Sequence, residues 1–160
     1  MSYQKLQGYV ALEVFLCDNT NIPFPNEVAR GTTTATTADE LIDTNASFLV
    51  DGVKEGDIVY NTTDKTCAQI LQVTNQKLVL NANIMANGES YIIYVANPAS
   101  GADDANNGCV LYVGGTGDLK VVTIAGQTVT FKAVPVGFFP VQVKKIFNTG
   151  SSATDIIALW

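Results

Sequence analysis

The sequence predicts an all-β protein: a small β-sandwich or barrel built from both ends of the chain, carrying an inserted small β-barrel or sandwich module. Three observations lead to this prediction. Short runs of β-branched and aromatic residues recur along the chain, Gly, Asn, Asp and Pro separate them, and no segment of helical length carries an apolar stripe with a 3.6-residue period. The 160 residues can bury a core without a metal or a disulfide.

The first quarter of the chain contains one long strand signal followed by irregular sequence. Residues 9–17 form an apolar run rich in strand formers, which predicts a strand. Two prolines within 18–26 exclude a helix or a central strand there. A Thr-rich stretch follows at 32–37, and 38–42 is long enough for one helical turn at most.

The middle of the chain has closely spaced strand and turn signals, which predict a small barrel or sandwich. Gly52 and Gly56 are expected to bracket a turn, and Asn87-Gly88 is a strong hairpin signal. Residues 97–108 lack large apolar side chains and are predicted to form a linker or an exposed loop. The expected strands are 58–60, 67–73, 78–80 and 91–95.

The last third is again rich in strand signals. Ala125-Gly126 is a candidate two-residue hairpin turn, and the alternation within 128–133 predicts a half-buried strand. The glycines of 114–117 predict a tight turn that requires positive φ. The expected strands are 109–113, 119–124, 127–131, 141–147 and 156–160.

Composition argues against several classes of function. The net charge is −6 and Lys144-Lys145 is the only adjacent basic pair, so a nucleic-acid partner is not expected. The first residues lack a signal-peptide pattern and no stretch has the length of a membrane span, so we expect synthesis in a cytoplasm and no membrane partner. Charged residues make up only 15% of the chain, which suits a surface that packs against neighbouring molecules.

Residues with catalytic chemistry are scarce. The chain has no histidine, which removes the usual general base and zinc ligand. Cys17, Cys67 and Cys109 are odd in number and match no ligand spacing, so we expect them to be small buried hydrophobic residues. Asp103-Asp104 is the most obvious carboxylate pair, but its loop context favours solvation. We therefore predict a protein that is not an enzyme, with no catalytic, cofactor or metal site.

Five short motifs occur in order in the last third: LYVGGTGD from Leu111, GQTVTF from Gly126, VPVG from Val134, PVQV from Pro140, and TGSSATDI from Thr149. This order resembles small β-rich virion proteins of tailed bacteriophages, among them capsid decoration and head-associated proteins. Ser151-Ser152 replaces the Thr pair that is usual in the family. The resemblance covers roughly half of the chain and implies a virion structural protein.

In that family a Pro-rich turn precedes the LYVGG strand closely, whereas here the corresponding segment, residues 17–25, lies far upstream. The resemblance therefore implies an insertion. Residues 1–30 with 109–160 would form a discontinuous, capsid-facing β domain, and 31–108 an acidic, outward-facing module. The charge of 31–108 is −7 and that of the remainder is +1, in agreement with two differently used parts.

The resemblance favours a capsid decoration, or cement, protein that binds and stabilises the lattice of the major capsid protein, as a homotrimer within the virion. Phe138, Phe139 and Trp160 are the candidate interface residues, since large aromatic side chains at corners and termini often anchor interfaces. A head-fibre base, a neck protein or a tail protein is the alternative. A carbohydrate-binding tip protein is a third possibility, with Tyr60, Tyr91 and Tyr94 as candidates, although we expect these tyrosines to pack in a core.

Overall fold

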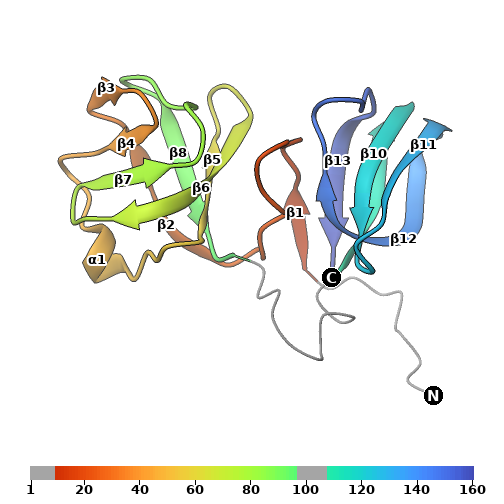
Figure 1. The fold of residues 1–160 in the computed structure, drawn as a ribbon, viewed down its shortest axis with the longest axis horizontal. Helices are drawn as coiled ribbons and strands as arrows, with labels where there is room; N and C mark the ends of the chain where they lie inside the picture. The colour runs from red at the N-terminus through yellow and green to blue at the C-terminus, as the bar shows by residue number, and fades with distance from the viewer. Residues whose placement is uncertain (1–9, 97–107) are drawn as a thin grey trace, which may run out of the picture. The chain divides into compact units, whose positions relative to one another are not determined.

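The computed structural model describes residues 10–96 and 108–160, and it confirms the all-β prediction. It contains two antiparallel sheets, of six and seven strands, and one four-residue helix, α1 (Phe48–Asp51) (Figure 1). The chain divides into two compact units. Met1–Val14 and Pro98–Trp160 make up one, called here the terminal unit, and Phe15–Asn97 makes up the other, the central unit.

The terminal unit is a six-stranded sheet that joins both ends of the chain. In order across the sheet its strands are β1 (Ala11–Glu13), β13 (Thr154–Leu159), β9 (Cys109–Gly115), β12 (Gly137–Ile146), β10 (Gly117–Thr123) and β11 (Thr128–Val134). In β1, β9, β10 and β13 buried apolar residues alternate with more exposed ones, so one face of each of these strands contributes to the core.

Strand β1 brings the N-terminal segment into this sheet. It pairs antiparallel with β13, placing Leu12 opposite Ala158, and both side chains are buried. Backbone hydrogen bonds between Val10 and Trp160 and from the Val14 N–H to the Ile156 carbonyl extend the pairing at both ends. Of the strand expected at 9–17, residue 9 lies outside the described residues, and within 10–17 the strand is β1, with Phe15 and Cys17 belonging to the central unit.

The glycines of the LYVGGTGD motif do not form the predicted turn with positive φ. They lie at the end of β9 and the start of β10, and their function is close backbone approach. A Cβ atom at Gly115 would lie 2.0 Å from Thr154 Oγ1, and one at Gly117 would lie 2.3 Å from the Ala153 nitrogen. These glycines allow the segment that leads into β13 to lie against the β9–β10 connection.

The predicted hairpin around Ala125-Gly126 is confirmed, but residues 124–127 connect its strands instead of the expected two-residue turn. It joins β10 to β11, Gly126 has φ +87°, and its N–H donates to the Thr123 carbonyl over 2.8 Å. The prediction that 128–133 is half-buried is wrong, because β11 lies at the edge of the sheet and Val129 is 38% exposed. A strand with one neighbour keeps more of its side-chain area in contact with water.

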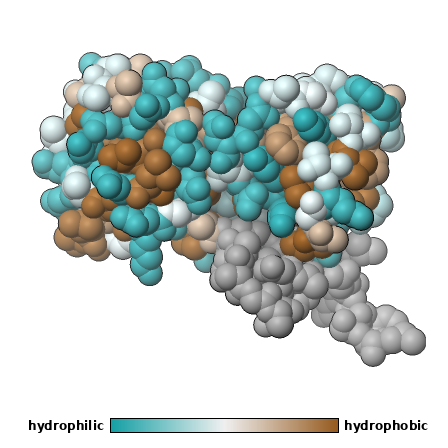
Figure 2. All heavy atoms as spheres, in the orientation of Figure 1, coloured by the Kyte–Doolittle hydropathy of each residue, from teal (hydrophilic) through white to brown (hydrophobic). Residues whose placement is uncertain are grey.

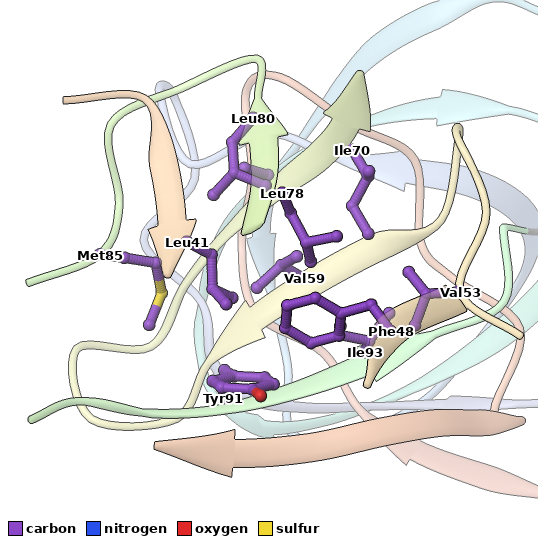
Figure 3. Close-up of a cluster of buried hydrophobic side chains, with 11 residues drawn as sticks. Leu41, Phe48, Val53, Val59, Ile70, Leu78, Leu80, Met85, Tyr91 and Ile93 are labelled. Carbon is purple, nitrogen blue, oxygen red and sulfur yellow. The ribbon is translucent and has the colours of Figure 1, made fainter. Parts of the chain in front are cut away.

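The central unit contains the seven-stranded sheet. Its buried side chains converge from the strands and from Phe48 of α1 onto one cluster that includes Leu41, Leu78 and Ile93 (Figure 3). In order across the sheet its strands are β2 (Glu27–Thr32), β8 (Ser90–Tyr94), β5 (Ile58–Asn61), β6 (Thr66–Val73), β7 (Lys77–Leu80), β4 (Glu40–Ile42) and β3 (Ala35–Thr37).

The predicted domain boundary at residue 30 is wrong, because residues 15–30 belong to the central unit. Strand β2 pairs with β8 in the seven-stranded sheet. Phe15 stacks on Tyr60 with ring centroids 4.5 Å apart. All three cysteines are buried, as expected, but Cys17 forms a disulfide with Cys67 of β6 and is therefore more than a small hydrophobic residue. Packing and a covalent bond thus attach this segment to the central unit.

Two local predictions in the central unit are also corrected. Asn87-Gly88 forms a turn, with Gly88 at φ +83°, but β7 and β8 do not pair across it. Strand β8 pairs instead with β2 and β5, and its Tyr91 and Ile93 are buried in the core cluster of the central unit. The single helical turn lies at α1, where Gly52 adopts φ +86° at the C-terminus, while Glu40–Ile42 is strand β4.

Candidate protein-interaction surface

The two adjacent phenylalanines of β12 point to opposite faces of the terminal sheet, because successive side chains of a strand alternate. Phe139 is 7% exposed and its ring packs edge-on against Phe131, with centroids 4.8 Å apart. Phe138 is 75% exposed. The structure therefore assigns Phe139 to the core and leaves Phe138 as a surface residue.

Phe138 lies in a row of apolar side chains that crosses three neighbouring strands. It is paired with Tyr112 of β9, which in turn is paired with Ile157 of β13. The rings of Phe138 and Tyr112 meet edge to face with centroids 5.6 Å apart, and Ile157 is 36% exposed. We call Phe138, Tyr112 and Ile157 the apolar row.

The apolar row lies on the outer face of the sheet. The neighbours of its members along each strand, Leu111, Phe139 and Ile156, are buried on the opposite face. The row continues to Glu13 of β1, which is paired with Ile157. Apolar side chains that meet on an exposed sheet face without a covering layer are typical of a surface that binds another protein.

Trp160 is only partly exposed, and its backbone pairs with Val10 at the edge of the sheet. It is not part of the apolar row. Tyr112 and Ile157 were not predicted as interface residues, although the sequence carried a signal for Tyr112. In the run Leu111-Tyr112-Val113 a period of two places Tyr112 opposite two core residues. The pairing that brings Ile157 beside it depends on strand order.

The net charge of the chain is carried by the central unit. By sequence, that unit has ten acidic and four basic residues, and the terminal unit has five of each. Phe138 and Ile157 of the apolar row carry no charged group, so covering these side chains requires no charge desolvation.

Acid–base properties in the terminal unit reflect local contacts. The Lys132 ammonium, which donates to Asp118 Oδ2 over 2.6 Å, and the Ala133 N–H, at 3.0 Å from Oδ1, lower the pKa of Asp118. Burial raises the pKa of the Cys109 thiol to about 12, so this thiol stays protonated and unreactive at neutral pH.

The central unit has its own exposed apolar residues. Leu49 and Val50 of α1 are 60% and 83% exposed. Figure 2 shows hydrophobic residues at the surface around α1. Unlike the apolar row, these two side chains are consecutive residues of one short helix and are not joined to others by strand pairing.

Over residues 10–96 and 108–160, no group of three or more His, Cys, Asp and Glu side chains is placed to hold a metal ion. A helix long and apolar enough to cross a membrane is likewise not found in the part of the chain that the structure describes. No protein-family model, no curated protein and no solved structure matches this chain.

Proposed function

We propose that the protein is a bacteriophage capsid decoration protein, not an enzyme, which binds the assembled lattice of major capsid protein through the terminal unit. The apolar row is the observation that carries this proposal. It places Phe138, Tyr112 and Ile157 side by side on three paired strands, which suits docking against a large protein partner. The order of the five motifs in the last third supports a virion protein.

In the proposed mechanism, binding of this protein increases the stability of the capsid lattice. A protein that binds the assembled lattice and not its separate subunits stabilises the lattice by mass action. A trimer at a three-fold position would bind the lattice through three copies of a modest interface. Its overall affinity would exceed that of one copy, because the three sites are linked. In this proposal the protein is made in the host cytoplasm and resides in the virion.

The proposal is tested by sedimenting purified protein with assembled capsids of the encoding phage. Phe138→Ser removes the most exposed aromatic ring of the row, and we expect the affinity to fall at least about tenfold, as for a central interface residue. Val129→Ser on β11 is the matched control, because it also replaces an exposed apolar side chain with serine outside the row. Equal binding by both variants would contradict docking through the row.

A head-fibre base, neck or tail protein is the second candidate, since each also requires a docking surface. An electron-microscopy map of the virion separates the candidates by position. Density for the protein on the capsid shell supports the decoration role. Density restricted to the neck or tail would mean that the apolar row docks against a neck or tail protein instead.

A further inference from the structure

A polar cleft of about 430 Å³ opens in the central unit beside β2. Strand β2 is at the edge of the seven-stranded sheet, and its residues 29–32 line one side of the cleft. The turn after β4 and the end of α1 line the other side. The volume is within the range of sites for small molecules. The lining residues outside β2 are Asp43, Asn45, Ala46, Ser47, Asp51 and Tyr91.

The floor of the cleft is formed by two buried polar side chains. The Tyr91 hydroxyl donates to Asp43 Oδ2 over 2.7 Å, and the Asn45 N–H donates to Asp43 Oδ1 over 2.9 Å. Tyr91 is 1% exposed and Asp43 is 4% exposed. Burial and the hydrogen bond to Asp43 raise the pKa of Tyr91, so its hydroxyl keeps its proton. The floor is therefore a fixed hydrogen-bonded pair.

Gly31 keeps the space above this pair open. A Cβ atom at this position would lie 2.5 Å from the Tyr91 hydroxyl oxygen and 2.6 Å from Asp43 Oδ2. Any larger residue would displace the pair or fill the cleft. Glycine is required here because there is no space for a side chain at the floor of the cleft. A left-handed backbone is not the reason, since the φ angle of Gly31 is not positive.

The walls carry hydrogen-bonding groups of both kinds. Asn45 and Ser47 each supply a donor and an acceptor, and Asp51 supplies acceptors. Ser47 precedes α1, but its hydroxyl makes no capping hydrogen bond to the helix. The aliphatic contribution is limited to two alanines, Ala29 and Ala46.

The charged side chains around the cleft indicate whether its ligand is an anion, a cation or a neutral molecule. Two carboxylates, Asp43 and Asp51, disfavour an anion. The guanidinium of Arg30, a further lining residue, donates hydrogen bonds to the Glu27 carboxylate, so its positive charge is already balanced. Both oxygens of Asp43 already accept hydrogen bonds, which leaves Asp51 as the remaining carboxylate of the lining.

We propose that the cleft binds a neutral saccharide unit. Sugar hydroxyls both donate and accept hydrogen bonds, which matches walls that offer both kinds of group. Only one carboxylate of the lining, Asp51, is left to bind a cation, since both oxygens of Asp43 already accept hydrogen bonds. Asp51, Asn45 and Ser47 would bind the hydroxyls, above the Tyr91–Asp43 floor. This site is separate from the apolar row and does not depend on capsid binding.

The test is an NMR titration of the full-length protein with glucose, galactose and N-acetylglucosamine, with inorganic phosphate and putrescine as charged probes. We expect at least one sugar to shift the amide signals of residues 30–32 and 45–51, with a Kd on the order of 1 mM. The double variant Asn45→Ala/Asp51→Ala should weaken this binding at least about tenfold. Glu55→Ala, an exposed acid outside the cleft, should leave the Kd unchanged.

Three outcomes would overturn the proposal. They are the absence of shifts at these residues with all three sugars, tighter binding of phosphate or putrescine than of any sugar, and an unchanged Kd in the double variant. A thermal melt of each variant establishes that it is folded, so that lost binding is not mistaken for lost structure.

Discussion

The terminal and central units are both antiparallel sheets, but they are held together differently. In the terminal unit one edge of the sheet is formed by β1, a three-residue strand from the far end of the chain, which is joined to the sheet by backbone pairing with β13. The central unit is one continuous segment, with a disulfide and a buried Tyr91–Asp43 pair. The neutral terminal unit presents an apolar row, whereas the acidic central unit presents a polar cleft. This difference is the basis for proposing a protein partner for the terminal unit and a small polar ligand for the central unit.

The largest expected effect comes from matched core substitutions, Leu111→Ala in the terminal unit and Leu78→Ala in the central unit. Both leucines are fully buried, so each change should reduce the free energy of unfolding of its own unit by about 2–5 kcal/mol. Differential scanning calorimetry should show one transition shifted and the other unchanged in each variant. A common shift of a single transition would mean that the units unfold as one.

The disulfide provides the next comparison. It joins residues separated by 50 positions, and in the chain-entropy model closing such a loop contributes about 4 kcal/mol. We expect Cys17→Ser to lower the Tm of the central unit under oxidising conditions and to leave the terminal unit unaffected. With excess reductant, the variant and the original protein should melt alike. A variant that melts like the original without reductant would contradict a stabilising disulfide.

The Tyr91–Asp43 pair should have a smaller effect. Tyr91→Phe leaves Asp43 Oδ2 without its phenolic donor in a buried position, which costs about 1–3 kcal/mol. Urea unfolding measures this loss when it is followed by NMR signals of residues in the central unit. Thr62→Val, which removes a hydroxyl hydrogen-bonded to the Ser90 carbonyl in a less buried position, is the comparison and should cost less.

The smallest effect concerns pH and the edge of the terminal sheet. Because Lys132 and the Ala133 N–H lower the pKa of Asp118 in the folded state, the pair stabilises the protein above the pKa of an unfolded aspartate, and this contribution is lost as the pH falls through the lowered pKa. Asp118→Asn should therefore decrease the Tm slightly at pH 7 and not at strongly acidic pH. An equal decrease at both pH values would point to lost packing instead of lost charge.

The sequence predicted the all-β class and the β10–β11 hairpin because these depend on short-range patterns of apolar residues and turn residues. It did not predict that β7 and β8 are separated by other strands, since strand order depends on contacts between distant segments. The pairing of Cys17 with Cys67 was missed for the same reason. Of the three candidate interface residues, only Phe138 lies in the apolar row. Alternation along β12 could have separated it from Phe139.

The sequence did not predict the polar cleft beside β2. Tyr91 was considered as a carbohydrate contact and expected to pack in the core, and the structure shows that it is buried at the floor of a cleft. The cleft exists because Gly31, the turn at Asp43 and α1 come together beside the edge of β2. No local motif encodes that arrangement.

The most direct test of the account is to replace residues 15–97 with a short Gly/Ser linker and to measure folding and capsid binding of the resulting chain. The account predicts a cooperative thermal melt and capsid affinity close to that of the full protein, because β1 pairs with β13 and the apolar row is complete without the central unit. A chain that folds but does not bind capsids would contradict docking through the terminal unit. A chain that does not fold would contradict its structural independence.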